Sequence, residues 1–123
     1  MAANQTVVDI GSKLSLLSGF PFPSSKFSSS EGFPLIRIRD VVASNVETYY
    51  RGPVLPQYVV REGDVLVGMD GDFNVAKWRN GDALLNQRVL KVGVLSPDDL
   101  DPAFMFYWLQ PYVAKINEIT AAT

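Results

Sequence analysis

The chain contains no cysteine and no histidine among its 123 residues. The lack of cysteine excludes disulfides, thiolate nucleophiles, zinc fingers and iron–sulfur clusters. The lack of histidine excludes a Ser-His-Asp triad and any imidazole metal ligand. Catalysis would have to depend on carboxylates, lysine, tyrosine or a serine–lysine pair, so the composition favours a binding protein over an enzyme.

Long apolar runs are also absent. The longest extends from Ala103 to Leu109, far short of the roughly 20 residues that span a bilayer. The N-terminus lacks a basic region followed by an apolar stretch, so we expect a cytoplasmic protein with no membrane association. With 47% hydrophobic and 20% charged residues, the chain has the composition of one folded domain.

An excess of positive charge is missing as well, because 13 acidic residues outnumber 11 basic ones. This balance excludes a nucleic-acid-binding protein of the uniformly basic kind. Residues 92–123 carry one basic and four acidic residues, whereas residues 26–91 carry nine basic and eight acidic ones. The middle of the chain can therefore present a basic face although the chain as a whole is acidic.

Hydrophobic periodicity and turn residues predict several strands. Residues 34–40 alternate between two faces, which predicts a half-buried strand with Arg37 and Arg39 on one side. Residues 43–57 contain Gly, two prolines and no period, and predict a long surface loop. Residues 58–60 and 65–69 predict a hairpin around the turn at 61–64, with its second strand buried on both faces. Residues 74–79 and 82–94 predict another hairpin around Asn80-Gly81.

The C-terminal part predicts a helix. Asp101 is an N-cap followed by Pro102, and residues 103–118 are helix formers and aromatics that we expect to pack on the sheet, with a kink or restart at Pro111. No glycine or proline stops this helix, so we expect a piece of a longer protein. The fold class is α+β, a mainly antiparallel β domain over residues 1–101 followed by a truncated helical region over residues 102–123.

One acidic segment resembles a metal loop. Residues 70–74, Asp-Gly-Asp-Phe-Asn, copy the first half of a calcium loop. Val75 and Gly81 stand where that loop needs glycine and a bidentate glutamate, so no metal site is predicted. Two alternatives to a nucleic-acid-binding function stay open. They are a metal-dependent nuclease built on Asp64, Asp70 and Asp72, and a β-rich protein-interaction domain.

The segment Lys77-Trp78-Arg79-Asn80 combines basic, aromatic and amide side chains. Lysine and arginine neutralise phosphates, arginine also contacts guanine edges, asparagine matches adenine, and tryptophan can stack or wedge between bases. The structural alternative is that Trp78 packs on the sheet while its neighbours are solvated edge residues. Asn86-Gln87-Arg88 allows the same two interpretations, a DNA contact or a hydrogen-bonded bulge.

Four motifs occur in an order that carries a family resemblance. They are Gly19–Phe27 (GFPFPSSKF), Gly32–Asp40 (GFPLIRIRD), Gly63–Gly71 (GDVLVGMDG) and Leu85–Val89 (LNQRV), followed by the aromatic helix. Together they resemble a target recognition domain from the DNA specificity subunit of a type I restriction-modification system. The resemblance covers roughly Ile10 to Glu118.

The resemblance implies a function without catalysis and without cofactors. In that family the subunit has two such domains, each of which reads one half of a split double-stranded DNA target. Long helices join the domains and hold methyltransferase subunits, and restriction subunits join for cleavage. A chain with one domain in place of two resembles a truncated fragment or a half-subunit, which could assemble as a homodimer.

The resemblance also divides the candidate DNA-binding residues into two groups. Residues of the shared motifs, such as Asn86, Gln87 and Arg88, should hold the fold or contact phosphates, because one scaffold serves many targets. Sequence reading should fall to residues 44–57 and 72–82, with Arg51, Lys77 and Arg79 as the first candidates. The DNA-binding residues predicted are Lys26, Asn45, Tyr49, Tyr50, Arg51, Asn74, Lys77, Trp78, Arg79, Asn80, Gln87 and Arg88.

Overall fold

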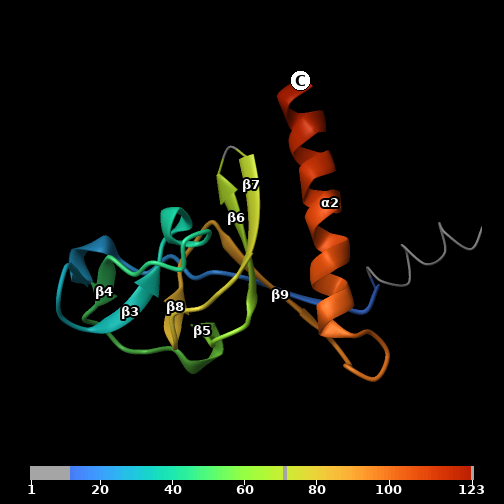
Figure 1. Cartoon of the computed structure of the whole chain (residues 1–123). Coiled ribbons are helices and arrows are strands. Elements are labelled where there is room, and N and C mark those ends of the chain that lie inside the picture. The colour runs from blue at the N-terminus through green and yellow to red at the C-terminus, as the bar shows by residue number, and fades with distance from the viewer. Residues whose placement is uncertain (1–11, 71, 123) are drawn as a thin grey trace, which may run out of the picture.

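The computed structural model describes residues 12–70 and 72–122, which form two sheets and one long helix (Figure 1). The four-stranded sheet has the order β1-β9-β6-β7 and contains β1 (Leu14–Ser18), β6 (Val65–Asp70), β7 (Asp72–Lys77) and β9 (Val89–Val94). The five-stranded sheet has the order β2-β4-β3-β8-β5 and contains β2 (Phe27–Ser28), β3 (Phe33–Ile36), β4 (Thr48–Tyr50), β5 (Val59–Val60) and β8 (Ala83–Leu85). Short 3-10 helices lie at η1 (Ser24–Lys26), η2 (Ile38–Asp40) and η3 (Pro56–Tyr58), and the long helix is α2 (Pro102–Ala122).

The four-stranded sheet is the middle layer, with α2 on one face and the five-stranded sheet on the other (Figure 1). Its central strand β6 follows the period of two predicted from the sequence. Val65 and Val67 pack toward α2, where Met105 and Leu109 are buried, while Leu66 packs in the core between the sheets. Since successive side chains of a strand point to opposite faces, β6 is buried on both, as predicted.

Both predicted hairpins are wrong, because the chain crosses between the sheets at the expected turns. β5 pairs with β8 and β6 pairs with β7 and β9, so residues 61–64 join strands of different sheets. Residues 78–82 likewise join β7 to β8 rather than closing a hairpin. All residues of β8 are buried. A strand that is apolar on both faces is stable only where both faces are covered, as in the interior of the protein. In the predicted hairpin, one face of β8 would be exposed to solvent.

Two further predictions around residues 34–57 are corrected. Strand β3 ends at Ile36 and is followed by η2. The Asp40 carboxylate stabilises the start of η2, because it accepts a hydrogen bond of 2.9 Å from the Arg37 backbone N–H. Arg37 and Arg39 therefore do not share a strand face. The predicted long loop contains β4, whose Thr48 and Tyr50 are buried and whose register pairs Tyr50 with Phe33.

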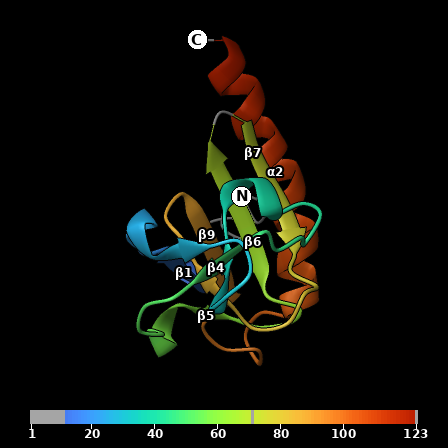
Figure 2. The same cartoon turned by 90° about the vertical axis from the view of Figure 1, so that its left-hand side faces the viewer.

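Helix α2 begins at Pro102, and the Asp101 carboxylate accepts a hydrogen bond of 2.9 Å from the Ala103 N–H, as the cap sequence predicted. The helix continues through Pro111 without a restart. It runs beside β7 (Figure 2), where the Asn117 amide pairs with both backbone groups of Phe73. Phe106 and Trp108 pack on the sheet, whereas Tyr107 is 71% exposed. Within residues 12–70 and 72–122, no helix is long and apolar enough to cross a membrane.

Candidate nucleic-acid interface

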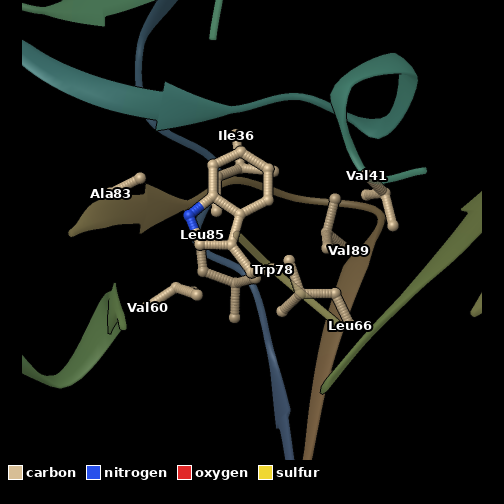
Figure 3. Close-up of a cluster of buried hydrophobic side chains, with 8 residues drawn as sticks. All are labelled: Ile36, Val41, Val60, Leu66, Trp78, Ala83, Leu85 and Val89. Atoms are coloured by element: carbon tan, nitrogen blue, oxygen red, sulfur yellow. The ribbon is translucent and has the colours of Figure 1, made fainter. Parts of the chain in front are cut away.

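Trp78 does not form part of a surface. Its side chain is fully buried between the two sheets, among Ile36, Leu66, Leu85 and other apolar side chains (Figure 3). The indole N–H donates a hydrogen bond of 2.8 Å to the Gly81 carbonyl. The prediction that Trp78 stacks on DNA is therefore wrong. Packing between the sheets buries the whole ring and gives its N–H a hydrogen-bond partner.

Tyr50 is a second correction of the same kind. Its side chain is 5% exposed, and its ring centroid lies 4.9 Å from that of Phe22 and 6.4 Å from that of Phe27. These edge-on contacts belong to the apolar cluster on the outer face of the five-stranded sheet. Tyr50 thus supports the sheet and does not present its ring to DNA.

Ser44 joins two loops that are distant in the sequence. Its hydroxyl accepts a hydrogen bond of 3.0 Å from the Arg79 backbone N–H and donates one of 3.4 Å to the Lys77 carbonyl. The Ser44 carbonyl accepts a hydrogen bond of 2.9 Å from the Asn80 side-chain amide. We call this set of contacts the Ser44 junction. It connects the turn after η2 with residues 78–82, the linker between β7 and β8.

The same linker is attached on its other side to the turn at residues 61–64. The Gly63 N–H donates to the Trp78 carbonyl at 2.7 Å, and the Trp78 N–H donates to the Asp64 carbonyl at 2.8 Å. The Gly81 N–H donates to the Glu62 carboxylate at 2.9 Å. Together with the buried indole beneath it, these bonds hold the linker backbone in one conformation.

Asn45, Arg79 and Asn80 are exposed at the Ser44 junction. The Arg79 guanidinium forms no ion pair with any residue that the structure describes. The Glu62 and Asp82 carboxylates of the two linkers are already engaged, since Glu62 accepts from Gly81 and Asp82 lies 3.3 Å from Arg61. An exposed guanidinium beside exposed amides provides the groups that contact guanine and adenine edges in the major groove.

Lys77 points away from this surface. Its ammonium lies 4.7 Å from the centroid of the Phe106 ring on α2, a cation–π contact, and the side chain is half-buried. The Lys77 side chain, predicted from the sequence to contact DNA, therefore packs against α2.

Lys26, Tyr49 and Arg51 form a second group, toward the β2 edge of the five-stranded sheet. The Arg51 N–H donates to the Lys26 carbonyl at 2.9 Å, and Tyr49 is half-buried opposite Ser28 and Pro34. The Arg51 guanidinium lies 4.0 Å from the Glu31 carboxylate, with both side chains largely exposed. No hydrogen bond or ion pair within the described residues links this group to the Ser44 junction.

The remaining candidates lie at other places on the molecule. Gln87 and Arg88 are exposed in the turn between β8 and β9, where Arg88 has a φ of 68° and its carbonyl accepts a bond of 2.9 Å from the Met69 N–H. Asn74 is exposed on β7, and its amide donates to the Asp72 carbonyl. The twelve predicted residues are therefore spread over several surfaces, and the structure brings only three of them together at Ser44.

The Asp64 and Asp72 carboxylates of the nuclease alternative do not meet, and the side chain of Asp70 lies outside the described residues. Asp64 precedes β6 and Asp72 begins β7 beyond the far end of that strand. A strand of six residues places its ends about 20 Å apart at ~3.3 Å per residue. The Asp64 carboxylate instead accepts from the Arg61 N–H and lies 3.9 Å from the Lys91 ammonium. Among the side chains that the structure describes, no cluster of acidic residues could hold a metal ion.

A cavity of about 280 Å³ lies between α2 and the four-stranded sheet. Its walls are apolar and include Leu14, Val92 and Trp108. Small-molecule sites also contain a few polar groups that orient the ligand. No charged residue lines this cavity among the residues described, and Trp108 and Tyr112 are the lining residues whose side chains carry a nitrogen or oxygen atom.

Asp40 is the buried charged residue beneath the Ser44 junction. Its side chain is 1% exposed, and burial raises the pKa of its carboxyl above the ordinary value of 3.8, against the opposing effect of the hydrogen bond from Arg37. The Asp40 carbonyl accepts a bond of 3.3 Å from the Asn45 N–H and closes the turn that carries Ser44. Asp40 thus supports the junction from inside and is not positioned for acid–base chemistry at the surface.

The sequence does not predict Ser44 as a functional residue. Residues 44–57 are predicted as a reading loop, but nothing in the local pattern distinguishes this serine from the other serines of the chain. Its φ of 52° is in the left-handed region, where asparagine and glycine are the expected residues. The contact that gives Ser44 its role joins residues 35 positions apart, and only the folded chain shows it.

Comparison with known proteins identifies a similar curated sequence and similar solved structures. No family model matches the chain. It is 42% identical over 116 residues to the type I restriction enzyme EcoBI specificity subunit of Escherichia coli, a match that covers 94% of this chain and 24% of that subunit. The resemblance predicted from the four motifs is thereby confirmed. The chain spans about a quarter of the length of this relative.

The fold is likewise confirmed as α+β by the solved structures. A chain from a study of complex assembly and conformational transition of the type I R-M system matches with a TM-score of 0.66 and 19% identity, over 90% of this chain and 28% of that chain. The HsdS subunit from Thermoanaerobacter tengcongensis matches with a TM-score of 0.59 and 20% identity, over 88% of this chain and 28% of that chain.

Proposed function

We propose that this chain, as a segment of a type I restriction-modification specificity subunit, is a target recognition domain that binds double-stranded DNA sequence-specifically and reads one half of a bipartite target. The observation that carries the proposal is the 42% identity to a type I specificity subunit over 94% of the chain. The surface at the Ser44 junction supports it, because Asn45, Arg79 and Asn80 are exposed together there.

The proposed mode of binding is base contact in the major groove. An arginine can donate two hydrogen bonds to a guanine edge, and an asparagine can pair with an adenine edge. Arg79 is the first candidate for the guanine contact, because no carboxylate of the described residues pairs with it. Lys26, Arg51, Gln87 and Arg88 are proposed to contact phosphates, which fix the register of the protein on DNA without reading its sequence.

The domain is proposed to act without catalysis of its own. Modification and cleavage would be carried out by the methyltransferase and restriction subunits that assemble with a specificity subunit, in the cytoplasm. The domain division at residues 101 and 102 assigns target reading to the β-rich part and assembly to the helical part. A homodimer of half-subunits is the assembly that would supply the second half of a bipartite target.

The test is selection of bound duplexes from a randomised DNA pool at low salt and then at near-physiological salt, followed by sequencing. The expected result is one enriched motif of a few base pairs that persists as the salt concentration rises. Sequence-specific reading would be overturned if a chain that is folded in the same buffer enriches no motif and its binding is abolished by salt.

A variant pair locates the reading surface. Arg79→Ala should remove the preference for one base pair of the motif, whereas Lys115→Ala removes an equally exposed positive charge from α2 and should leave the motif unchanged. If both variants keep the same motif, Arg79 is not a base contact.

A further inference from the structure

We propose that Ser44 is a positioning residue for sequence reading, which holds the Arg79–Asn80 linker and the Asn45 turn together as one rigid reading surface. This inference rests on the proposed DNA-binding function and adds to it a residue that itself contacts no base. The proposal concerns the selectivity of binding and not the overall affinity.

The Ser44 hydroxyl bridges two backbone groups, one on each side of Trp78. One oxygen accepts from the Arg79 N–H at 3.0 Å and donates to the Lys77 carbonyl at 3.4 Å. A hydroxyl can both donate and accept, which alanine and glycine cannot do. The Asn80 amide donates a further hydrogen bond of 2.9 Å to the Ser44 carbonyl. Lys77, Arg79 and Asn80 are therefore all hydrogen-bonded to Ser44.

The backbone of Ser44 has a φ of 52°. Residues with a side chain are disfavoured in this left-handed region, and glycine occupies it without steric cost. A position that needs only the conformation would therefore be best served by glycine. Serine is present where its hydroxyl bridges two backbone groups, so the side chain offsets the unfavourable conformation.

The fold does not depend on the bridge that the Ser44 hydroxyl forms. The linker is anchored independently by the buried Trp78 ring, by the bonds of Trp78 to Gly63 and Asp64, and by the bond from Gly81 to Glu62. Removal of the Ser44 hydroxyl leaves all of these contacts in place. It removes only the hydroxyl bonds to Arg79 and Lys77, so the linker stays joined to the Asn45 turn by the bond from the Asn80 side chain alone.

A released linker should lose selectivity before it loses affinity. Bidentate base contacts need side chains held within about 0.5 Å and 10–20° of the productive geometry. Phosphate contacts tolerate much larger displacements, because they depend mainly on charge. Arg79 on a looser linker would still attract DNA but would discriminate less between the correct base pair and its competitors.

The experiment compares the Ser44→Ala and Ser44→Gly variants of the chain with the Ser15→Ala control, which alters an exposed serine of β1. The probes are the duplex enriched by the unsubstituted chain and the same duplex with one motif base pair replaced. Both Ser44 variants should reduce the ratio of the two affinities on the order of tenfold, as loss of one bidentate contact would. Binding to an unrelated duplex at the same salt concentration should stay within about twofold, well inside the ~1.4 kcal/mol of a tenfold change.

Two readouts separate positioning from a general loss of structure. Amide hydrogen exchange at Arg79 should accelerate in the Ser44 variants, while exchange at Gly63, which donates to the Trp78 carbonyl, should not change. Ser44→Gly suits the positive φ and keeps the chain folded if Ser44→Ala is strained. Two folded variants that keep the full affinity ratio would overturn the proposal.

The outcomes also distinguish this proposal from the proposed function. If the unsubstituted chain enriches no motif, sequence reading itself fails. If it enriches a motif and the Ser44→Gly variant keeps the same selectivity at unchanged thermal stability, the function stands and the positioning role of Ser44 is wrong.

Discussion

Trp78-Arg79 and Tyr50-Arg51 are two aromatic–arginine pairs with the same arrangement and different surroundings. In each pair the aromatic ring is buried and the following arginine is exposed. The Arg79 N–H is held by the Ser44 hydroxyl, and the Arg79 guanidinium has no ion-pair partner in the described part of the chain. The Arg51 N–H is held by the Lys26 carbonyl, and the Arg51 guanidinium lies 4.0 Å from Glu31.

The comparison separates two properties that the sequence alone combines. A buried aromatic fixes the backbone of the next residue, and this occurs in both pairs. Only the Trp78-Arg79 pair leaves its guanidinium without a carboxylate neighbour, on a surface that also carries exposed amides. Arg79 can therefore bind a base edge without displacing a protein group, whereas Arg51 must share its charge with Glu31.

The largest expected effect is on stability. Trp78→Ala should lower the free energy of unfolding by about 3–5 kcal/mol, because a large ring is removed from the core between the sheets. Urea denaturation of the variant and the unsubstituted chain measures this difference. Near-normal stability combined with lost DNA binding would instead return Trp78 to the role of a DNA contact.

The second effect concerns base discrimination by the two arginines. Arg79→Ala should cost about 1–3 kcal/mol of discrimination at one base pair, and Arg79→Lys should fail to restore it because lysine lacks the planar fork of donors. Arg51→Ala should weaken binding to all duplexes similarly. Titrations with matched and substituted duplexes check this contrast, and equal loss of discrimination in both alanine variants would remove it.

The third effect is a pH dependence of the stability contributed by Asp40, which supports the Ser44 junction and thus the Trp78-Arg79 pair. Because burial raises the pKa of Asp40 above 3.8, its contribution to stability is greatest below that pH and is lost as the pH rises through the raised pKa. The stability of Asp40→Asn relative to the unsubstituted chain should therefore increase over the same pH range. Denaturation curves at several pH values test the sign, and a constant difference would show that Asp40 titrates normally.

The smallest expected effect comes from Glu31. Glu31→Gln removes the carboxylate near Arg51, and because both side chains are largely exposed the stability should change by less than about 1 kcal/mol. DNA binding should strengthen slightly and equally for all duplexes, with a steeper dependence on salt concentration. Asp82→Asn, which likewise removes only the charge of a carboxylate next to an exposed arginine, Arg61, is the matched control, and a change of the selected motif in Glu31→Gln would assign base reading to Arg51 after all.

Local patterns predicted the features that local chemistry decides. The alternation in β6, the cap at Asp101 and the glycine turns at Gly63 and Gly81, both with positive φ, depend on neighbours within a few residues. The partner strands could not be predicted in this way, because a turn sequence shows that the chain reverses but not which sheet it enters. Burial of β8 in the five-stranded sheet decided that outcome.

The candidate site was predictable only in part. Arg79, Asn80 and Asn45 could be predicted as DNA contacts, because of their residue types and because they lie outside the four motifs shared with the family. The burial of Trp78 and Tyr50 does not follow, since an aromatic beside basic residues fits both a core and a DNA surface. Ser44 was not predictable at all, because its role depends on a contact between two loops that only the tertiary structure brings together.

The connections between the sheets also bear on how the chain folds. Residues 61–64 and 78–82 carry the chain from one sheet to the other, and the parallel pairing of β3 with β8 joins segments distant in sequence. Contacts of this kind slow folding, because a long loop must close before they form. Neither sheet can be completed without these connections, and the proposed reading surface lies on the one at residues 78–82. Under the proposed function, a partly folded chain would therefore be unable to select a DNA sequence.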